Sequence, residues 1–476
     1  MNLLNNAKWN ALSQLIKIGV QLVNIVFLAK IIPPSEYGLM AMALVIVNLG
    51  TLLRDLGTSS AVIREKNLTN ELVNTVFWLN VLMGVSLAII ICSLSTVIAN
   101  LFHQEQLSLI LITISVIFPL SSCATAHLAM LQRESRFKAI SYAEIFSSLV
   151  SVIVAIVAAL KGFGVYSLVF QSITMNLISA VLFWKLSNWR PLTNQFINIS
   201  ELKRIFNFTM NLSFFNIINY FSRNADSFLI GRYMSAAILG AYNLAYRIML
   251  FPLQSLTFVA TRSLYPILSH YQNENGKVSS IYLNCVFVVL IISAPLMSGI
   301  AIISEPFVYW IFGPQWHITA DVLKWLAPTS ILQSVLSTTG SVFMAKGRTD
   351  ILFRLGIYGT VLQVSGFLIG VQYDIDTFVK IYFIANILNF FPVMICVLKI
   401  LDSSLKDFFI KIYPVIFSVI IMIAVVLLVK RSLSYHFLHD SSTVIFYSTI
   451  GFFSYIIPLF VISSDFRNFI LNKIKK

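Results

Sequence analysis

The stretch "VFWLNVLMGVSLAIIICSLSTVIAN" at residues 76–100 contains no charged side chain. At about 1.5 Å per residue, a helix of this length crosses a bilayer hydrocarbon core of about 30 Å. Runs of the same kind recur along the chain, whereas a β-barrel would show alternating segments of about ten residues. Of the 476 residues, 58% are hydrophobic and 11% are charged, against about a quarter charged in soluble domains. The sequence therefore predicts an all-α integral membrane protein.

Fourteen apolar runs can be delimited, so we expect fourteen transmembrane helices. The predicted spans are 9–31, 38–63, 76–100, 107–131, 140–160, 164–184, 205–230, 238–266, 281–304, 320–343, 351–371, 376–399, 412–430 and 442–463. The first run lacks a preceding basic segment and a following cleavage site, so we expect a retained helix and not a signal peptide. The loops between the runs are short. We therefore expect the function to lie within the membrane.

Basic residues are unevenly distributed between the predicted loops. With the N-terminus in the cytoplasm, the cytoplasmic segments carry 21 of the 33 Lys and Arg residues and the opposite loops carry five. Cytoplasmic loops of membrane proteins are enriched in Lys and Arg, so both termini are predicted to be cytoplasmic. The net charge of +14 then reflects topology, and we expect no nucleic-acid partner.

The longest polar stretch between spans, Lys185 to Arg204, separates the first six spans from the next six. We place the lobe boundary there. The expected organisation is a first lobe at 1–190, a cytoplasmic linker at 191–204, a second lobe at 205–400, and spans thirteen and fourteen with a cytoplasmic tail at 401–476.

An internal similarity supports two related lobes. A shift of 202 residues lays "AKIIPPSEYGLMAMA" (29–43) on "GRYMSAAILGAYNLA" (231–245) and matches Gly38 to Gly240. The same shift carries four polar residues of the first span, Gln14, Lys17, Gln21 and Asn24, onto Asn216, Asn219, Arg223 and Asp226 of the seventh. Repeats with an even number of spans keep the same orientation, which predicts parallel lobes that can rock against each other.

Spacings of three and four residues place each of these polar sets on one face of its helix. A charged side chain at mid-bilayer costs about 2.5–3.5 kcal/mol on insertion scales, so these faces are predicted to turn away from lipid. Taken singly, Asn and Gln are explained as well by hydrogen bonds between helices. Arg223 and Asp226 lie one turn apart and could neutralise each other, whereas Lys17 has no acidic neighbour.

The second and eighth spans add further polar residues. Arg54 and Asp55 are adjacent and so point about 100° apart, and a stripe shared with Asn48 favours Asp55 as the inward residue. The eighth span places Asn243 and Arg247 on one face. Spans 1, 2, 7 and 8 thus predict a centre rich in cations and amides, which suits a phosphate or pyrophosphate joined to sugars.

The predicted site follows from these faces. The substrate-binding residues are Lys17, Gln21, Asn24, Arg54, Asn219, Arg223, Asn243 and Arg247. The candidates for ion coupling are Asp55, Asp226 and Glu144, although structural pairing explains each of them equally well. No P-loop, HExxH or GxSxG motif is present, and the four cysteines lack ligand spacing. We expect no enzyme, no cofactor and no metal.

Nine short segments between residue 1 and about residue 400 share one family's pattern and order. They are "EYGLMAMALVIV", "RDLGTSSAVI", "LQRESRFKAISYAE", "GFGVYSLVFQ", "NWRP", "NADSFLIGRYMSAAILGAYNLAYRIMLFP", "YPILSHYQ", "PQW" and "AKGR". The chain thereby resembles the Wzx-type polysaccharide exporters, in particular the WzxC-like lipopolysaccharide and colanic acid branch of the multidrug/oligosaccharidyl-lipid/polysaccharide (MOP) superfamily.

The resemblance implies two six-helix lobes in a V, as in MATE-like transporters, plus two C-terminal helices. It implies a flippase in the bacterial inner membrane that moves an undecaprenyl-pyrophosphate-linked oligosaccharide, such as an O-antigen repeat unit, to the periplasmic leaflet. The cations of the passage would be Lys17, Arg54, Arg223 and Arg247. H⁺ or Na⁺ would be the coupling ion, and the polymerase and glycosyltransferases of the pathway would be partners. Spans thirteen and fourteen match poorly, and a groove for the lipid tail is one role open to them.

Three other functions compete with this one. An ion-coupled multidrug efflux pump would share the scaffold, but such pumps handle cationic substrates, for which a cationic cavity is a poor match. A flippase for the peptidoglycan lipid precursor would differ mainly in glycan size. A membrane-embedded polymerase or ligase would carry a large outer loop, and the outer loops predicted here are short.

Overall fold

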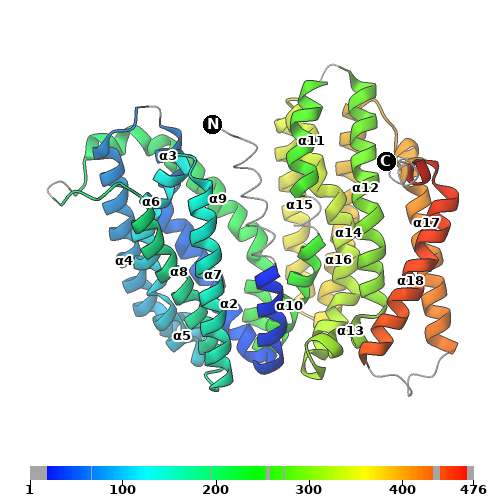
Figure 1. Ribbon diagram of the computed structural model, residues 1–476, viewed down its shortest axis with the longest axis horizontal. Coiled ribbons are helices and arrows are strands. Elements are labelled where there is room, and N and C mark those ends of the chain that lie inside the picture. Colours follow the sequence, from blue (N-terminus) through cyan, green and yellow to red (C-terminus); the bar gives the residue numbers. More distant parts are fainter. Residues whose placement is uncertain are drawn as a thin grey trace. The chain divides into compact units, whose positions relative to one another are not determined.

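The computed structural model describes residues 19–65, 67–193, 196–252, 258–271, 274–432 and 440–468 (Figure 1). Every regular element in these ranges is a helix, which confirms the predicted all-α class. Packing divides the chain into two compact units, Met1–Gly240 and Ala241–Lys476.

The first unit contains nine described helices and the start of a tenth. They are a helix at Gly19–Ile31, α2 (Pro34–Asp55), α3 (Thr58–Arg64), α4 (Asn70–Leu101), α5 (Gln106–Ile114), α6 (Ile117–Arg133), α7 (Phe137–Leu160), α8 (Val165–Leu186), α9 (Ile199–Tyr233) and the first residues of α10 (Ala236–Pro252). Ile205 of α9 is buried together with Val62 of α3 and Val73 of α4. The Tyr220 hydroxyl, also on α9, donates a hydrogen bond to the carbonyl of Val45 on α2.

The second unit contains the rest of α10 and all later helices. They are α11 (Phe258–His270), α12 (Asn275–Ile302), α13 (Ser304–Ile311), the 3₁₀ turn η2 (Pro314–Trp316), α14 (His317–Ala345), α15 (Thr349–Gly370), α16 (Ile375–Ile400), α17 (Leu405–Ser432) and α18 (Asp440–Ile462). Tyr282, Phe343, Met394 and Phe408 lie in one buried cluster that joins α12, α14, α16 and α17.

The last two helices, orange and red in Figure 1, pack onto this unit through α12. The Tyr455 hydroxyl of α18 donates a hydrogen bond of 2.9 Å to the carbonyl of Ile291 on α12. Spans thirteen and fourteen are therefore part of the packed body of the second unit.

Ten helices of the described residues are long and apolar enough to span a membrane, counting α5 and α6 as one at Gln106–Arg133. The helices α9 and α14, at 35 and 29 residues, are long enough but more polar. The apolar helices Gly19–Ile31 and Ala236–Phe251 are shorter in the described residues. The protein thus crosses the membrane many times, and the total of fourteen spans stays a prediction.

The second predicted span, 38–63, is wrong as a single helix. It breaks between α2 and α3, where Leu56 and Gly57 have φ angles of 46° and 73°. Glycine has no Cβ and takes this left-handed conformation readily, so the pair ends one helix and starts the next. The break places Asp55 at the end of α2 and Thr58 at the start of α3.

The two segments related by the 202-residue shift contact each other within the first unit. A Cβ added to Gly38 would lie 1.7 Å from the carbonyl oxygen of Ala236, and one added to Gly240 would lie 1.9 Å from that of Pro34. The shift exchanges Gly38 with Gly240 and Pro34 with Ala236. The contact, hereafter the glycine contact, therefore has the symmetry of the repeat.

The unit boundary at Gly240 falls later than the linker expected at 191–204, because α9 packs against α2, α3 and α4. Packing and sequence repetition are different properties of a chain. The lobes at 1–190 and 205–400 and the C-terminal part at 401–476 accordingly stay predictions.

Candidate functional site

The polar face of the first span is described from Gly19 onward, so Lys17 lies outside the described residues. Gln21 is exposed. Asn24 is partly buried, and its Nδ2 donates to Oε1 of Gln171 on α8 at 3.5 Å. The Asn24 Oδ1 is buried without a hydrogen-bond partner among the residues that the structure describes. Asn24 therefore joins two helices and still has an acceptor to offer.

Arg54 lies inside the first unit. Its side chain is 7% exposed, and Nη1 donates a hydrogen bond to the hydroxyl of Ser121 on α6. Its Nε is buried and has no hydrogen-bond partner within the described part of the chain. A buried cation is costly unless its donors are satisfied, so Arg54 retains the capacity to bind an anion.

Asp55 occupies the break between α2 and α3. Its Oδ1 accepts hydrogen bonds from the Ser59 backbone N–H and the Thr58 hydroxyl, each at 3.4 Å, and from the Ser59 hydroxyl. The Thr58 hydroxyl in turn accepts a hydrogen bond of 2.9 Å from Nδ2 of Asn80 on α4. Asp55 thus caps α3, where a carboxylate is favoured by the helix dipole. Broken helices of this kind line substrate and ion sites in transporters.

Three residues of α9 that the sequence placed on one face separate in the structure. Asn219 and Arg223 are exposed, whereas Asp226 is 5% exposed and its Oδ1 accepts a hydrogen bond of 2.6 Å from the Ser227 backbone. No ion pair or hydrogen bond joins Arg223 to another described residue. The structure therefore does not pair Arg223 with Asp226, although the two residues lie one helical turn apart.

Asn243 and Arg247 lie on the part of α10 that belongs to the second unit. Asn243 is partly buried and Arg247 is exposed. Their spacing of four residues keeps both on one side of the helix.

The three candidates for ion coupling lie on three different helices of the first unit. Asp55 ends α2, Asp226 is buried on α9, and Glu144 is partly buried on α7. Among the described residues, no group of three or more His, Cys, Asp or Glu side chains is placed to hold a metal ion.

Sequence patterns missed the partners of these residues. Ser121 and Gln171 contact Arg54 and Asn24 across 67 and 147 residues of chain. Glu36, in the first turn of α2, lies against the start of α8, because a Cβ added to Gly164 would be 2.4 Å from Oε2 of Glu36. An acidic residue in the first turn of an apolar helix was a signal for Glu36, but nothing local in the sequence points to the other two.

Together, these helices define a multi-pass membrane protein with buried polar groups of the kind found in transporters. The chain belongs to the polysaccharide biosynthesis protein family, whose model matches residues 27–321. It is 27% identical over 417 residues to the lipopolysaccharide biosynthesis protein WzxC of Escherichia coli (strain K12), covering 86% of this chain and 84% of that protein. It is 26% identical over 392 residues to the teichuronic acid biosynthesis protein TuaB of Bacillus subtilis (strain 168), covering 82% and 80%. The predicted family is confirmed, whereas its WzxC-like branch stays a prediction.

Solved structures show the fold. The chain resembles the lipid II flippase MurJ in an inward closed conformation with a TM-score of 0.76 at 16% identity, covering 98% of this chain and all of that one. It resembles an inward-facing multidrug resistance MATE family transporter of the MOP superfamily with a TM-score of 0.61 at 15% identity, covering 82% and 96%. The predicted MOP-type fold is confirmed.

Proposed function

We propose that this protein flips a lipid-linked oligosaccharide, the repeat unit of a surface polysaccharide, across the bacterial inner membrane by alternating access. Membership of the polysaccharide biosynthesis family supports a glycan substrate. The relatives WzxC and TuaB are named for the biosynthesis of lipopolysaccharide and teichuronic acid. The lipid carrier is undecaprenyl pyrophosphate, and both termini lie in the cytoplasm.

One observation carries the proposal: two arginines of the first unit have donors without partners. Nε of Arg54 is buried and unsatisfied, and Arg223 is exposed on α9 without an ion pair among the described residues. Charge-assisted hydrogen bonds to a pyrophosphate would satisfy such donors, and each contributes about 1.5–3 kcal/mol net. The amides of Gln21, Asn24 and Asn219 suit the hydroxyls of sugars.

Transport, and not a covalent reaction, is the proposed activity. Asp55 is the proposed site of the coupling ion, H⁺ or Na⁺, because loss of its charge would weaken the cap on α3. Glu144 and Asp226 remain the other candidates. The polymerase and glycosyltransferases that extend and assemble the same glycan are the proposed functional partners.

The test is a strain that lacks the gene and is complemented with wild-type or variant protein. We expect the strain without the protein to accumulate lipid-linked repeat units on the cytoplasmic side and to lose surface polysaccharide. Wild type should restore both, whereas Arg223→Ala and Lys17→Ala should insert in the membrane without restoring either. Arg348→Ala is the control, because Arg348 is exposed and already paired with Asp350 at 3.1 Å.

Normal surface polysaccharide in both Arg223→Ala and Lys17→Ala would refute the proposed site. Resistance to cationic dyes on overexpression, with no change in lipid-linked glycan, would instead indicate a multidrug pump. Accumulation of the peptidoglycan precursor alone would indicate a precursor flippase.

A further inference from the structure

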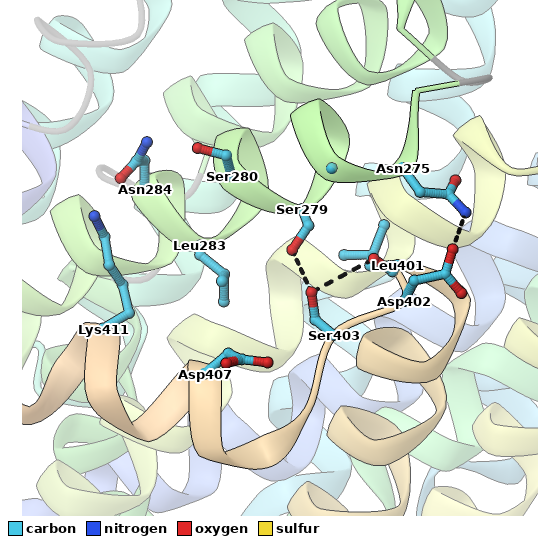
Figure 2. A pocket seen from close by; sticks show the side chains of 11 residues that line it. Asn275, Ser279, Ser280, Leu283, Asn284, Leu401, Asp402, Ser403, Asp407 and Lys411 are labelled. Carbon is cyan, nitrogen blue, oxygen red and sulfur yellow. Dashed lines mark hydrogen bonds between the residues drawn. The ribbon is translucent and has the colours of Figure 1, made fainter.

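A polar pocket of about 500 Å³, whose lining contains none of the predicted site residues, lies between the start of α12 and the start of α17. Figure 2 shows Ser280 and Asn284 of α12 on one side of it and Asp407 and Lys411 of α17 on the other. Both helices begin here, so the pocket lies where polar loops meet apolar helices.

The floor of the pocket is held by its own hydrogen bonds. The hydroxyls of Ser279 and Ser403 are 2.5 Å apart, and Asn275 donates a hydrogen bond to Asp402 (Figure 2). These bonds tie α12 to the loop that precedes α17. The floor is therefore ordered before a ligand binds, and the side chains at the rim are available for contacts with a ligand.

A second pocket of about 330 Å³ continues the first one, because both are lined by Leu283, Asp407 and Lys411. Its further lining combines four apolar residues, Phe287, Ile410, Pro414 and Ile462, with Ser463, Ser464 and Asp465. We call the two pockets together the α12–α17 groove. A groove that is lined by both charged and apolar side chains fits an amphiphile, and a membrane protein meets such molecules in its own bilayer.

The charges of the groove select among amphiphiles. Its lining contains three carboxylates, Asp402, Asp407 and Asp465, and one cation, Lys411. The excess of negative charge repels a purely anionic headgroup or a pyrophosphate. A headgroup that carries an ammonium beside its phosphate matches the mixture of charges.

Lys411 is held in place at the junction of the two pockets. Its Nζ lies 2.7 Å from Oδ2 of Asp465 and 5.4 Å from the centre of the Phe287 ring. Asp407 lies four residues earlier and therefore on the same side of α17. One of its oxygens accepts from the backbone and hydroxyl of Ser404, and the other has no partner in the described part of the chain. An acceptor and a cation thus stand one helical turn apart, about 6 Å.

We infer that the α12–α17 groove binds a phospholipid whose headgroup carries a primary ammonium beside its phosphate, as in phosphatidylethanolamine. The ammonium donates to Asp407 and to the amide oxygen of Asn284, and the phosphate accepts from Lys411. The acyl chains follow the apolar part of the groove. The lipid would then anchor α17, the first of the two C-terminal helices, against α12.

The experiment is native mass spectrometry of the purified full-length chain in detergent. Phosphatidylethanolamine, phosphatidylglycerol and phosphatidylcholine with identical acyl chains are each titrated, and the Kd of the first bound lipid is measured. We expect phosphatidylethanolamine to bind wild type about tenfold more tightly than the other two. Lys411→Gln and Asp407→Asn should each remove most of this preference.

Lys380→Gln is the matched control. Lys380 is also paired with an aspartate, Asp376 at 2.5 Å, and lies 5.6 Å from the Trp325 ring, but it does not line the groove. An equal loss in Lys380→Gln, or equal binding of phosphatidylglycerol by wild type, would overturn the inference. If Lys411→Gln fails to fold, Asp407→Asn decides the matter, because the amide oxygen of asparagine can still accept the two hydrogen bonds from Ser404.

Discussion

Adding one methyl group at Gly38 tests the glycine contact most directly. The new Cβ would lie 1.7 Å from the backbone oxygen of Ala236, whereas ordinary van der Waals contact begins at 3.4 Å. The two segments must therefore separate by about 1.7 Å, because a backbone carbonyl cannot rotate aside as a side chain does.

Overpacking of this kind costs about 1–3 kcal/mol, which changes the ratio of two conformations by about 5- to 150-fold. If transport requires this contact to form and to part, Gly38→Ala should lower the export of surface polysaccharide by a factor in that range. It should also lower the melting temperature of the purified protein. Both quantities can be measured in the complemented deletion strain and in detergent.

Gly299→Ala is the matched control, because Gly299 lies within α12 and a Cβ there meets nothing within 4 Å. We expect it to export normally. Gly240→Ala should act like Gly38→Ala, and the double variant should cost less than the sum, since the first methyl already separates the segments. Export and a melting temperature at wild-type levels in Gly38→Ala would refute the assignment of a functional contact.

Three further substitutions test the described contacts by the melting temperature of the purified protein. Ser121→Ala should destabilise by about 1–3 kcal/mol, because it leaves the buried Arg54 without its hydroxyl partner; an unchanged melting temperature would contradict the burial of that guanidinium. Gly57→Ala should cost about 1–2 kcal/mol, because φ is 73° there, and a stabilised variant would mean that the break is a continuous helix. Tyr455→Phe should cost about 0.5–1.5 kcal/mol through the lost hydrogen bond to Ile291 and leave export normal, and a wild-type melting temperature would contradict that bond.

The fold was predictable because few backbone structures are stable in a bilayer. Backbone groups in hydrocarbon must be satisfied within the segment, so a long apolar run such as 76–100 has to be a helix, and α4 covers it at Asn70–Leu101. The break at Leu56 and Gly57 was missed because the apolar residues before Arg54 and after Ser60 were joined into one span, 38–63. Hydropathy indicates whether a segment can lie in the bilayer. It contains no information about the φ angles of Leu56 and Gly57.

The site was only partly predictable, because helical spacing gives a face but not its boundary. Arg223 follows Asn219 by four residues and so turns about 40° from it, and both are exposed. Asp226 follows Arg223 by three residues and turns about 60° back, to within about 20° of Asn219, yet it is buried. Its burial therefore depends on what packs at its level of α9, which helical spacing does not contain. The pairing of Arg54 with Ser121 depends on how α2 and α6 are rotated against each other, and no local pattern contains that angle.

The glycine contact also restricts how this sequence can diverge. Pro34 faces Gly240, and Gly38 faces Ala236, so the side chain allowed at one position depends on the backbone at a position some 200 residues away. In a related protein with a larger residue at position 38, the backbone near position 236 must move away. The same movement changes the distance between positions 34 and 240. Related chains should consequently show correlated substitutions at these four positions, with the two pairs drifting together.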